Sequence, residues 1–389
     1  MQAVILAAGK STRCYPLTLT RPKPLLPLVS RTIIEHTLSQ LEGLVDEVII
    51  VVGYQKEMII SYLGTSFSGL KLRFIDQQEQ KGTGHALMMA SDFLKNRFLV
   101  LSGDDIYFRQ DLEKCLAHDL CLLVAEHRSP EHFGVVRTNG QFVEDIAEKP
   151  KNAKSNLVNT SAYVLNRSVF ELELKLSERG EFELVDYIRL LSDVYWEKVE
   201  KAWMPVTFPW NLLEANVLLL QEIEPQILGK VDDNVRLNGN VYIGKNSIIR
   251  SGCVIDGPAY IGDNCIIGPN AYIRPDTVIG ANCEIGFGVE IVDSLIFDHV
   301  FCKHRSYIGH SVIGSHVNLG AGFITADWRH DGKTHVTLVK GKKVDTLRDK
   351  LGAFIGDRVM TGIHTSVYPG RKIAPDATTL PGEVITADR

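Results

Sequence analysis

The residues best suited to chemistry lie at the start of the chain, in the segment L-A-A-G-K-S-T-R from Leu6 to Arg13. A short apolar strand leads into a loop of small residues, and the backbone N–H groups of such a loop can bind phosphate oxygens. Arg13 ends the loop, and Lys23 follows in R-P-K-P-L-L-P-L. Two fixed cations beside the loop would neutralise a polyphosphate. The pattern therefore predicts a nucleoside triphosphate site.

Alternating strands and helices are expected to position this site. Short, continuous apolar runs are typical of strands buried on both faces of a sheet, and helical segments separate them. This alternation indicates helices packed on a mostly parallel sheet. A closing helix is expected to end before Pro225. The expected elements are strands at 3–6, 48–52 and 98–101 and helices at 33–44, 84–94 and 211–223.

Beyond Pro225 the sequence repeats every six residues. A strict period of six fits neither an α-helix nor a simple strand, but it is typical of hexapeptide repeats that form a parallel β-helix. Three hexads complete one triangular coil, so each isoleucine of the repeat is expected to point inward. The residue two positions before each isoleucine is small or β-branched, as an inward corner requires. The isoleucines are 243, 249, 255, 261, 267, 273, 279, 285 and 291.

A pair of cysteines and a cationic insertion are two further features of this repeat. Cys265 and Cys283 lie one coil apart and could suggest a metal site, but we interpret them as fillers of the small inward position. The repeat loses phase after Ile291, and a polar, cationic insertion lies between Trp328 and Lys350. Such charged stretches are most often solvated loops, although insertions in solenoids often lie on a binding face.

Length and composition limit the possible classes of protein. A chain of 389 residues predicts two domains, 1–225 and 226–389. With 45% hydrophobic and 23% charged residues, the chain is expected to be soluble and globular. The net charge of -5 gives no reason to expect nucleic acid or an acidic membrane as partner. The absence of a long apolar run or signal peptide, with seven scattered cysteines, predicts a reducing cytoplasm.

The N-terminal half resembles the sugar-1-phosphate nucleotidylyltransferases. The motifs that match occur in the family's order: the two described above, then Q-E-Q-K-G-T-G-H-A, L-S-G-D-D, H-F-G-V-V, E-K-P, V-N-T-S and P-W-N-L-L-E-A-N. The whole chain is similar to the bifunctional enzymes that make UDP-N-acetylglucosamine, in particular to archaeal-type relatives that share R-H-D-G-K and V-K-G-K-K-V-D-T. The resemblance implies an α/β Rossmann-like nucleotidyltransferase domain followed by a left-handed parallel β-helix that forms a homotrimer or a higher oligomer.

In the implied reaction, the phosphate of a sugar 1-phosphate attacks the α-phosphorus of a nucleoside triphosphate, and pyrophosphate leaves. Since both reactants are anions, catalysis should rest on alignment and charge neutralisation. By resemblance, Arg13 would stabilise the pyrophosphate and Lys23 would bridge the α-phosphate, while Asp104 and Asn211 would hold Mg²⁺. The other implied residues are Ala8, Gly9, Ser11 and Thr12 at the triphosphate, Gln77, Gly82 and Thr83 at the base, and Gly134, Glu148, Lys149 and Asn159 around the sugar phosphate.

Each of these residues has a structural alternative. Aspartate after a strand end commonly caps a turn, and neighbouring opposite charges are often a solvated pair. These alternatives are a turn cap for Asp104, the N-cap of the closing helix for Asn211, a solvated pair for Glu148 with Lys149, a turn residue for Asp105, and packing beside the base loop for His85.

The segment K-H-R-S-Y-I-G, which interrupts the isoleucine repeat, indicates a second chemistry. Acetyl transfer from acetyl-CoA to an amino sugar needs a general base, most often histidine. By resemblance, His304 is that base, and Tyr307, Arg274 and Asn318 belong to the substrate site. Lysines at 340, 342 and 343 could bind the phosphates of coenzyme A or stay solvated.

Two positions depart from the family's pattern at this second site. The chain has Val292 where bacterial enzymes carry lysine, and Asp327 where relatives usually carry asparagine. Lys333 would replace part of the lost positive charge in substrate binding. These departures leave open which amino sugar is used, and whether the second activity is present.

Three functions therefore compete. The first is a bifunctional enzyme that transfers a nucleotidyl group from UTP or dTTP to N-acetylglucosamine 1-phosphate or glucose 1-phosphate, and acetylates glucosamine 1-phosphate or galactosamine 1-phosphate. The second is a nucleotidylyltransferase alone, with a structural or regulatory β-helix. The third is a non-catalytic subunit like those of translation-factor exchange complexes, which is disfavoured because Arg13, Lys23, Asp104 and Lys149 are retained. The sequence does not distinguish uracil from thymine, or glucose from N-acetylglucosamine.

Overall fold

The computed structural model describes residues 1–389, which form two compact units. The first unit contains Met1–Lys10 and Ile33–Pro205, and the second contains Ser11–Thr32 and Val206–Arg389. The segment that carries Arg13 and Lys23 therefore groups, by its contacts, with the C-terminal half of the chain. The division into domains at residue 225 stays a prediction. No helix combines the length and the apolar character that crossing a membrane would require.

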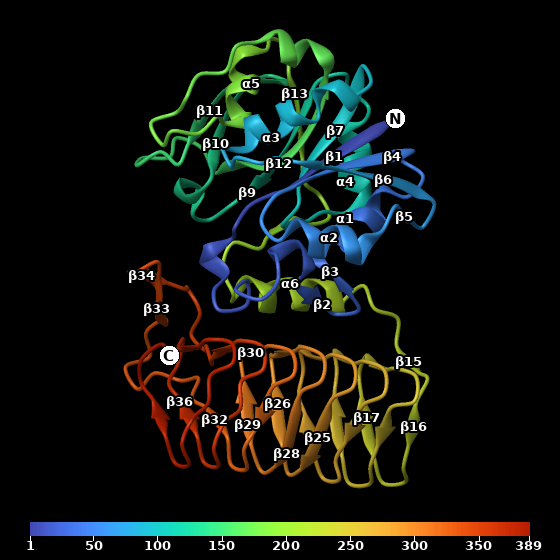
Figure 1. The fold of residues 1–389 in the computed structure, drawn as a ribbon, viewed down its shortest axis with the longest axis vertical. Coiled ribbons are helices and arrows are strands. Elements are labelled where there is room, and N and C mark those ends of the chain that lie inside the picture. Colours follow the sequence, from blue (N-terminus) through green and yellow to red (C-terminus); the bar gives the residue numbers. More distant parts are fainter. The chain divides into compact units, whose positions relative to one another are not determined.

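A ten-stranded sheet forms the centre of the first unit (Figure 1). Its middle is parallel, in the order β7-β1-β4-β6, and the strands predicted at 3–6, 48–52 and 98–101 are confirmed. β1 and β4 are buried along almost their whole length, because helices cover both faces of a parallel sheet. The bounds are Gln2–Ala7 for β1, Glu47–Val52 for β4, Leu70–Asp76 for β6, and Arg97–Ser102 for β7.

The expectation of a mostly parallel sheet holds for these central strands and for the pairing of β9 (Cys121–Glu126) with β13 (Tyr195–Lys198), and the other pairings are antiparallel. β12 (Leu157–Asn166) runs antiparallel to both β7 and β9. β10 (Gly134–Asn139) and β11 (Phe142–Glu148) form an antiparallel hairpin, because a connection of two residues cannot join parallel strands. The remaining strand of the sheet is β5 (Ser66–Phe67).

The helices begin close to their predicted starts but end earlier. Helix α1 covers Ile33–Leu41, α3 covers Thr83–Met89, and α6 covers Asn211–Leu220. After α3 the chain continues as a short 3-10 turn at Ser91–Phe93, which accounts for the apolar residues that extended the prediction. Helix α2 (Lys56–Leu63) follows β4.

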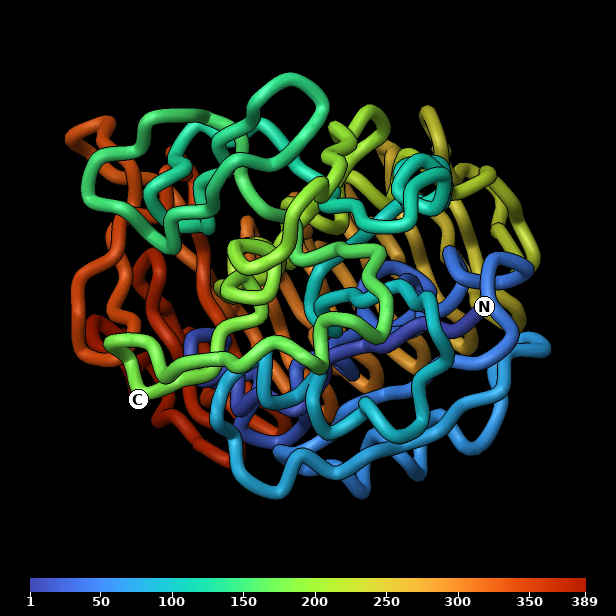
Figure 2. Tube along the Cα trace, turned by 90° about the horizontal axis from the view of Figure 1, so that it is seen from above, coloured from blue at the N-terminus to red at the C-terminus, as the bar shows by residue number.

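Three parallel sheets stack the coils of the C-terminal half into a left-handed β-helix, and the coils follow one another in sequence order (Figures 1 and 2). Ile243 pairs with Ile261, and Ile261 pairs with Ile279, so adjacent coils are offset by one 18-residue repeat. All the predicted isoleucines are fully buried, and burial of one such side chain contributes about 1.5–3 kcal/mol. The small column before them, which includes Cys265 and Cys283, is also buried.

The predicted loss of phase after Ile291 is the loss of one residue at the same corner of two successive coils. Ile279 pairs with Ile296, and Ile296 pairs with Ile313, so these coils are offset by 17 residues. The missing residues belong to the corner between Ile291 and Ile296 and to the corner between Ile308 and Ile313, which both lie between the same two sheets. Because the corners absorb the deletions, the inward positions remain buried.

The cationic insertion leaves the β-helix at the same corner, two coils further on. It connects β32 (Ile324–Thr325) to β35 (Phe354–Ile355). Its tip is an antiparallel hairpin of β33 (Val336–Val339) and β34 (Lys342–Asp345). An antiparallel bridge between Trp328 and Lys350 closes its base.

Within the second unit, α6 and the segment 11–32 pack on the β-helix. Helix α6 contacts β27 (Leu295–Ile296). The carboxylate of Asp357, on a coil, accepts hydrogen bonds from Arg21 Nη2 at 2.7 Å and from Thr20 Oγ1 at 2.6 Å. This carboxylate anchors the segment that leads to Lys23.

Candidate functional site

The end of β1 and the turn after β7 are in close contact in the first unit. The Gly103 N–H donates to the Leu6 carbonyl at 2.9 Å, and a Cβ at Gly103 would lie 2.8 Å from the same oxygen. Only glycine allows this approach. Asp104 follows in the turn, where its carboxylate accepts a hydrogen bond from Ser102 Oγ. The structure thus places Asp104 beside the strand that leads into Ala8 and Gly9.

The Ala8 peptide is fixed by two hydrogen bonds. Its carbonyl accepts from Gln80 Nε2 at 2.6 Å and from the Tyr54 N–H at 3.1 Å. Ala8 is buried, whereas Gly9 is exposed. The loop therefore leaves the sheet from a rigid base, which favours a preorganised phosphate contact.

The residues predicted at the base gather at the start of α3. The buried Gln77 donates from Nε2 to the Gly82 carbonyl at 2.9 Å, and the same nitrogen lies 3.2 Å from His85 Nδ1. Gly82 has a φ of 102°, a conformation that favours glycine. Thr83 Oγ1 accepts from the Leu184 N–H at 3.1 Å. The structure therefore brings Gln77, Gly82 and Thr83 together, with His85 packed beside Gln77.

The residues predicted around the sugar phosphate meet where three strands are adjacent. Gly134 pairs with Glu148, and a Cβ at Gly134 would lie 3.2 Å from Glu148 Oε2 and 3.4 Å from Asn159 Cβ. Lys149 Nζ lies 3.0 Å from Glu148 Oε1. Asn159 is buried and donates to Tyr163 Oη at 2.6 Å. Complete burial raises the pKa of the Tyr163 phenol, so this group stays neutral beside the site.

One cation beside the predicted sugar-phosphate residues could not be identified from the sequence. Arg179 Nη2 lies 3.4 Å from Glu148 Oε1 and 2.7 Å from Glu183 Oε1. The arginine belongs to the loop before α5 (Leu184–Leu190) and matches none of the motifs. Its place depends on long-range packing, so no local signal could have identified it.

The two predicted phosphate cations lie in the second unit. Ser11 adopts a left-handed conformation, and its carbonyl accepts from Thr18 Oγ1 at 2.9 Å, which fixes the turn before the 3-10 helix Thr12–Cys14. Arg13 is exposed, whereas Lys23 is only 5% exposed and donates to the Val206 carbonyl. Lys23 is thus a buried ammonium fixed by the backbone, and Arg13 is a cation that a ligand can reach.

The predicted metal ligands differ in how well they suit Mg²⁺. Oxygen donors are the ligands that Mg²⁺ takes, and the Asp104 carboxylate fits that preference. Asn211 Oδ1, in contrast, accepts from the backbone N–H groups of Thr207 at 3.2 Å and Phe208 at 2.9 Å. Its Nδ2 donates to Glu214 Oε2 at 2.7 Å. Both lone pairs of the Asn211 oxygen are therefore engaged, and the residue fixes the turn before α6.

The predicted first-site residues are divided between the units. The structure shows contacts within the base group and within the sugar-phosphate group, as described above. The first unit holds Ala8, Gly9, Gln77, Gly82, Thr83, Asp104, Gly134, Glu148, Lys149 and Asn159, and the second holds Ser11, Thr12, Arg13, Lys23 and Asn211.

The residues predicted for the second site occupy different faces of the β-helix. Arg274 Nη1 donates to Glu290 Oε1 at 2.9 Å, and Glu290 pairs in register with Tyr307, so these three share one sheet. His304 ends β28 (Phe301–His304) on the adjacent sheet, and Asn318 lies on that sheet too; both are exposed. Within one chain the structure does not gather all of these residues into one pocket.

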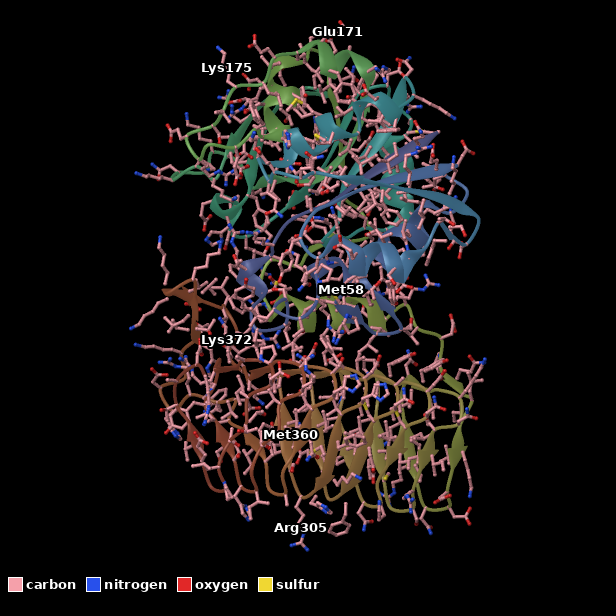
Figure 3. All side chains as sticks on the ribbon, viewed as in Figure 1. Met58, Glu171, Lys175, Arg305, Met360 and Lys372 are labelled. Atoms are coloured by element: carbon pink, nitrogen blue, oxygen red, sulfur yellow. The ribbon has the colours of Figure 1, made fainter.

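The neighbours of His304 are exposed as well. Arg305 follows it at the corner and extends outward, with its guanidinium 5.6 Å from the centre of the Phe287 ring (Figure 3). Lys333, in the insertion, is exposed, and its backbone N–H donates to Asp331 Oδ1 at 3.2 Å.

Both departures from the family's pattern lie next to Tyr307. Val292 pairs with Gly309 and is 9% exposed. Asp327 Oδ2 accepts from Tyr307 Oη at 2.7 Å, and a Cβ at Gly309 would lie 2.6 Å from each of these two oxygens. Burial and the Asp327 carboxylate raise the pKa of Tyr307, so its phenol stays protonated.

Comparisons with known proteins agree with this architecture. A family model described as nucleotidyl transferase matches residues 2–222, and one described as the GMPPB C-terminal domain matches residues 255–368. The bifunctional protein GlmU of Methanocaldococcus jannaschii is 41% identical over 379 residues, which covers 96% of this chain and 92% of that protein. The bifunctional sugar-1-phosphate nucleotidylyltransferase/acetyltransferase of Sulfurisphaera tokodaii is 38% identical, covering 100% of this chain and 98% of that protein.

A solved structure is similar to part of the chain. The crystal structure of a candidate glucose-1-phosphate thymidylyltransferase from Bacillus anthracis, in complex with a sucrose, is 28% identical with a TM-score of 0.52. It covers 56% of this chain and 95% of that chain.

Proposed function

Given that this chain belongs to the family of bifunctional GlmU-type sugar-1-phosphate nucleotidylyltransferase/acetyltransferases, we propose that its two halves catalyse two reactions on sugar 1-phosphates. The first transfers a nucleotidyl group from UTP or dTTP to N-acetylglucosamine 1-phosphate or glucose 1-phosphate and releases pyrophosphate. The second transfers an acetyl group from acetyl-CoA to the amine of glucosamine 1-phosphate, or of galactosamine 1-phosphate.

Charge neutralisation accounts for the first reaction. The sugar phosphate oxygen is already an anion, so its attack on the α-phosphorus needs no general base. Arg13 would stabilise the pyrophosphate as it leaves, and Lys23 would bridge the α-phosphate, since fixed cations oppose the repulsion between the reactants. Glu148 and Lys149 would hold the sugar phosphate for attack. The backbone of Ala8, Gly9, Ser11 and Thr12 would hold the triphosphate.

Asp104 would hold Mg²⁺ in this reaction. The ion would supply positive charge to the triphosphate. Asn211 would keep the turn before α6 in place, and it could join the metal only by giving up a bond to Thr207 or Phe208.

His304 and Tyr307 support the second reaction. An exposed histidine can accept a proton from the incoming ammonium group, which leaves a free amine to attack the thioester carbon of acetyl-CoA. The carbon–sulfur bond then breaks, the amine loses its remaining extra proton to form the amide, and coenzyme A leaves as a thiol after taking up a proton. Tyr307 and Arg274 would bind the sugar phosphate, and Asn318 and Lys333 would complete the substrate site. Since these residues occupy adjacent faces of the β-helix, we infer that a second copy of the chain completes the pocket, as in a homotrimer.

The cellular compartment is a further part of the proposal. All seven cysteines are free, buried thiols, which fits a reducing cytoplasm.

The observation that carries the nucleotidyl proposal is the contact group of Gly134, Glu148 and Asn159, together with the independently fixed Asp104. A product profile tests it most simply. Purified chain with magnesium is incubated with UTP or dTTP and each sugar 1-phosphate, and nucleotide sugars are measured by mass spectrometry. We expect one preferred nucleotide-sugar product, and formation of none would reject the proposal.

A second candidate function is nucleotidyl transfer alone, with the β-helix as a scaffold. Val292, in place of lysine, favours it, because a positive charge is missing beside Tyr307. Incubation with acetyl-CoA and each amino sugar 1-phosphate decides between the two. Acetylation that His304→Ala abolishes supports the bifunctional enzyme, and absence of acetylation supports the scaffold.

A further inference from the structure

Four ionisable side chains meet in a largely buried group at the corner of the β-helix where the repeat is shortened. We define this corner cluster as Asp293, His310, Asp327 and Arg348. His310 Nδ1 lies 2.8 Å from Asp293 Oδ2, and its Nε2 lies 3.3 Å from Asp327 Oδ2. Arg348 Nη2 donates to Asp293 Oδ2. The four side chains are each between 11% and 17% exposed.

The two carboxylates of the corner cluster face one guanidinium and one imidazole. His310 Nδ1 lies within hydrogen-bond distance of Asp293 Oδ2, and its Nε2 is in contact with Asp327 Oδ2. These polar partners limit the cost of burying the two carboxylates.

The shortened corner and the insertion build this cluster together. Asp293 and His310 occupy equivalent corner positions on successive coils, with φ of 38° and 50°. The backbone N–H of His310 donates to the Val292 carbonyl at 3.0 Å, and this hydrogen bond joins the two coils. Asp327 and Arg348 lie near the two ends of the insertion. Other ionisable groups near the cluster are Asp276, Glu214, which lies 3.9 Å from Arg348 Nη1, and His335, whose Nε2 lies 3.0 Å from the Asp327 carbonyl.

The cluster ends on the phenol of Tyr307. Asp327 Oδ2 is the atom that faces His310 and also the atom that accepts the hydrogen bond from Tyr307 Oη. Gly309 permits this contact, since a Cβ there would lie 2.6 Å from both oxygens. A continuous path of contacts therefore runs from Arg348 through Asp293, His310 and Asp327 to the phenol.

We propose that His310 is a positioning residue of the acetyl-transfer site, because it holds the Asp327 carboxylate in the orientation that fixes the Tyr307 phenol toward substrate. This inference rests on the proposed acetyltransferase function. In relatives with asparagine at the position of Asp327, an uncharged amide can accept the hydrogen bond from the phenol without a second polar partner. In this chain the carboxylate needs His310, so the two residues act as a pair.

A double-mutant cycle tests the pairing. We expect His310→Asn to raise the KM for the amino sugar 1-phosphate about tenfold with little change in kcat, because the Asp327 carboxylate loses its contact with the imidazole. Asparagine suits the left-handed backbone at this position. In the Asp327→Asn background, the same substitution should change KM less than about twofold.

Matched controls separate this role from a structural one. His316→Asn removes a histidine from another corner position, with φ of 59°, that stacks on His299 instead of contacting a carboxylate; it should leave KM unchanged. Nucleotidyl transfer, measured in the same samples, reports whether each variant is folded. An equal effect of His310→Asn in both backgrounds would mean that His310 serves the fold alone, and it would overturn the proposal.

A second readout does not require acetyl transfer. The rate of nitration of Tyr307 by tetranitromethane, followed by peptide mass spectrometry, reports how firmly the phenol proton is held. His310→Asn should accelerate nitration in the native background and not in the Asp327→Asn background. If nitration of the variants follows this pattern but the wild-type chain acetylates no amino sugar, the proposed acetyltransferase function fails while the placement of Tyr307 by His310 stands. Nitration that His310→Asn leaves unchanged would reject the inference itself.

Discussion

Fixed positive charge is the residue-level feature on which nucleotidyl transfer depends. Lys23 illustrates it, because its ammonium is almost fully buried and bonded to the Val206 carbonyl. A buried cation held by the backbone needs no reorganisation when an anion arrives, and such preorganised groups contribute most to phosphoryl transfer.

Replacing Lys23 with methionine should therefore slow nucleotidyl transfer far more than it destabilises the chain. We expect kcat to fall by about 10²–10³, the range for loss of one preorganised charge-stabilising group. Lys175, an exposed lysine (Figure 3), is the matched control, and Lys175→Met should have no effect. A fall of less than about threefold for Lys23→Met would show that this ammonium is only structural.

Thiol reactivity tests the burial of the cysteines. Burial raises the pKa of the Cys302 thiol to about 12, and the hydrogen bond with Cys265 together with burial raises that of Cys283 well above its usual value. A raised pKa keeps a thiol protonated at pH 8, and only the thiolate reacts with alkylating reagents. We expect native chain to resist iodoacetamide at pH 8, and chain in denaturant to be labelled at all seven positions. Rapid labelling of Cys302 in the native chain would contradict the buried column.

At the scale of elements, the contacts of segment 11–32 link the cations of the first site to the coils of the β-helix. Asp357 is the clearest link, because its carboxylate accepts from Arg21, Thr20 and the Ser315 N–H. Arg21 also lies over the Phe297 ring at 5.3 Å. The segment that presents Arg13 and Lys23 therefore depends on residues more than 300 positions away.

Asp357→Asn should reduce nucleotidyl transfer although the residue lies in the other half of the sequence. Loss of a charged acceptor for Arg21 costs about 1.5–3 kcal/mol, which we expect to appear as a roughly tenfold or greater fall in kcat/KM and as faster proteolysis within 11–32. The control is Asp376→Asn, which breaks an exposed pair with Arg358 and should change neither measurement. Unchanged kcat/KM in Asp357→Asn would show that the coils do not support the segment.

Gly309→Ala tests the second site at the same scale. The added methyl group would collide with both Tyr307 Oη and Asp327 Oδ2. Acetyl transfer should fall by at least about tenfold, since one hydrogen bond and its geometry are lost, while nucleotidyl transfer continues. Nucleotidyl transfer in the same samples serves as the control for folding. Equal rates for wild type and Gly309→Ala would argue against a role for the Tyr307–Asp327 contact.

For the molecule as a whole, the features that the sequence repeats were easier to predict than those that depend on distant contacts. The prediction that the isoleucines from Ile243 to Ile291 point inward was correct, because the inward position of each coil requires an apolar side chain. The parallel strands β1, β4 and β7 were predictable from their apolar runs for the same reason.

Other features had no local signal. The antiparallel direction of β12 comes from its pairing with β7 and β9, strands distant in the sequence, so no apolar run could indicate it. The corner cluster joins Asp293 to Arg348 across 55 residues, and His310 looked like any polar corner residue. The position of Asn211 was compatible with an N-cap of the closing helix and with a Mg²⁺ ligand. Only its hydrogen bonds from the N–H groups of Thr207 and Phe208 showed that its side-chain oxygen is engaged.

The central claim is that one chain carries two independent transfer reactions, and measuring both rates in the same samples of two variants tests it most directly. The account predicts that Arg13→Ala loses nucleotidyl transfer but keeps acetyl transfer. It predicts that His304→Ala keeps nucleotidyl transfer and loses acetyl transfer by about 10²–10⁴, the usual contribution of a general base. If either variant loses both rates while remaining folded, or if neither loses any, the two-site account is wrong.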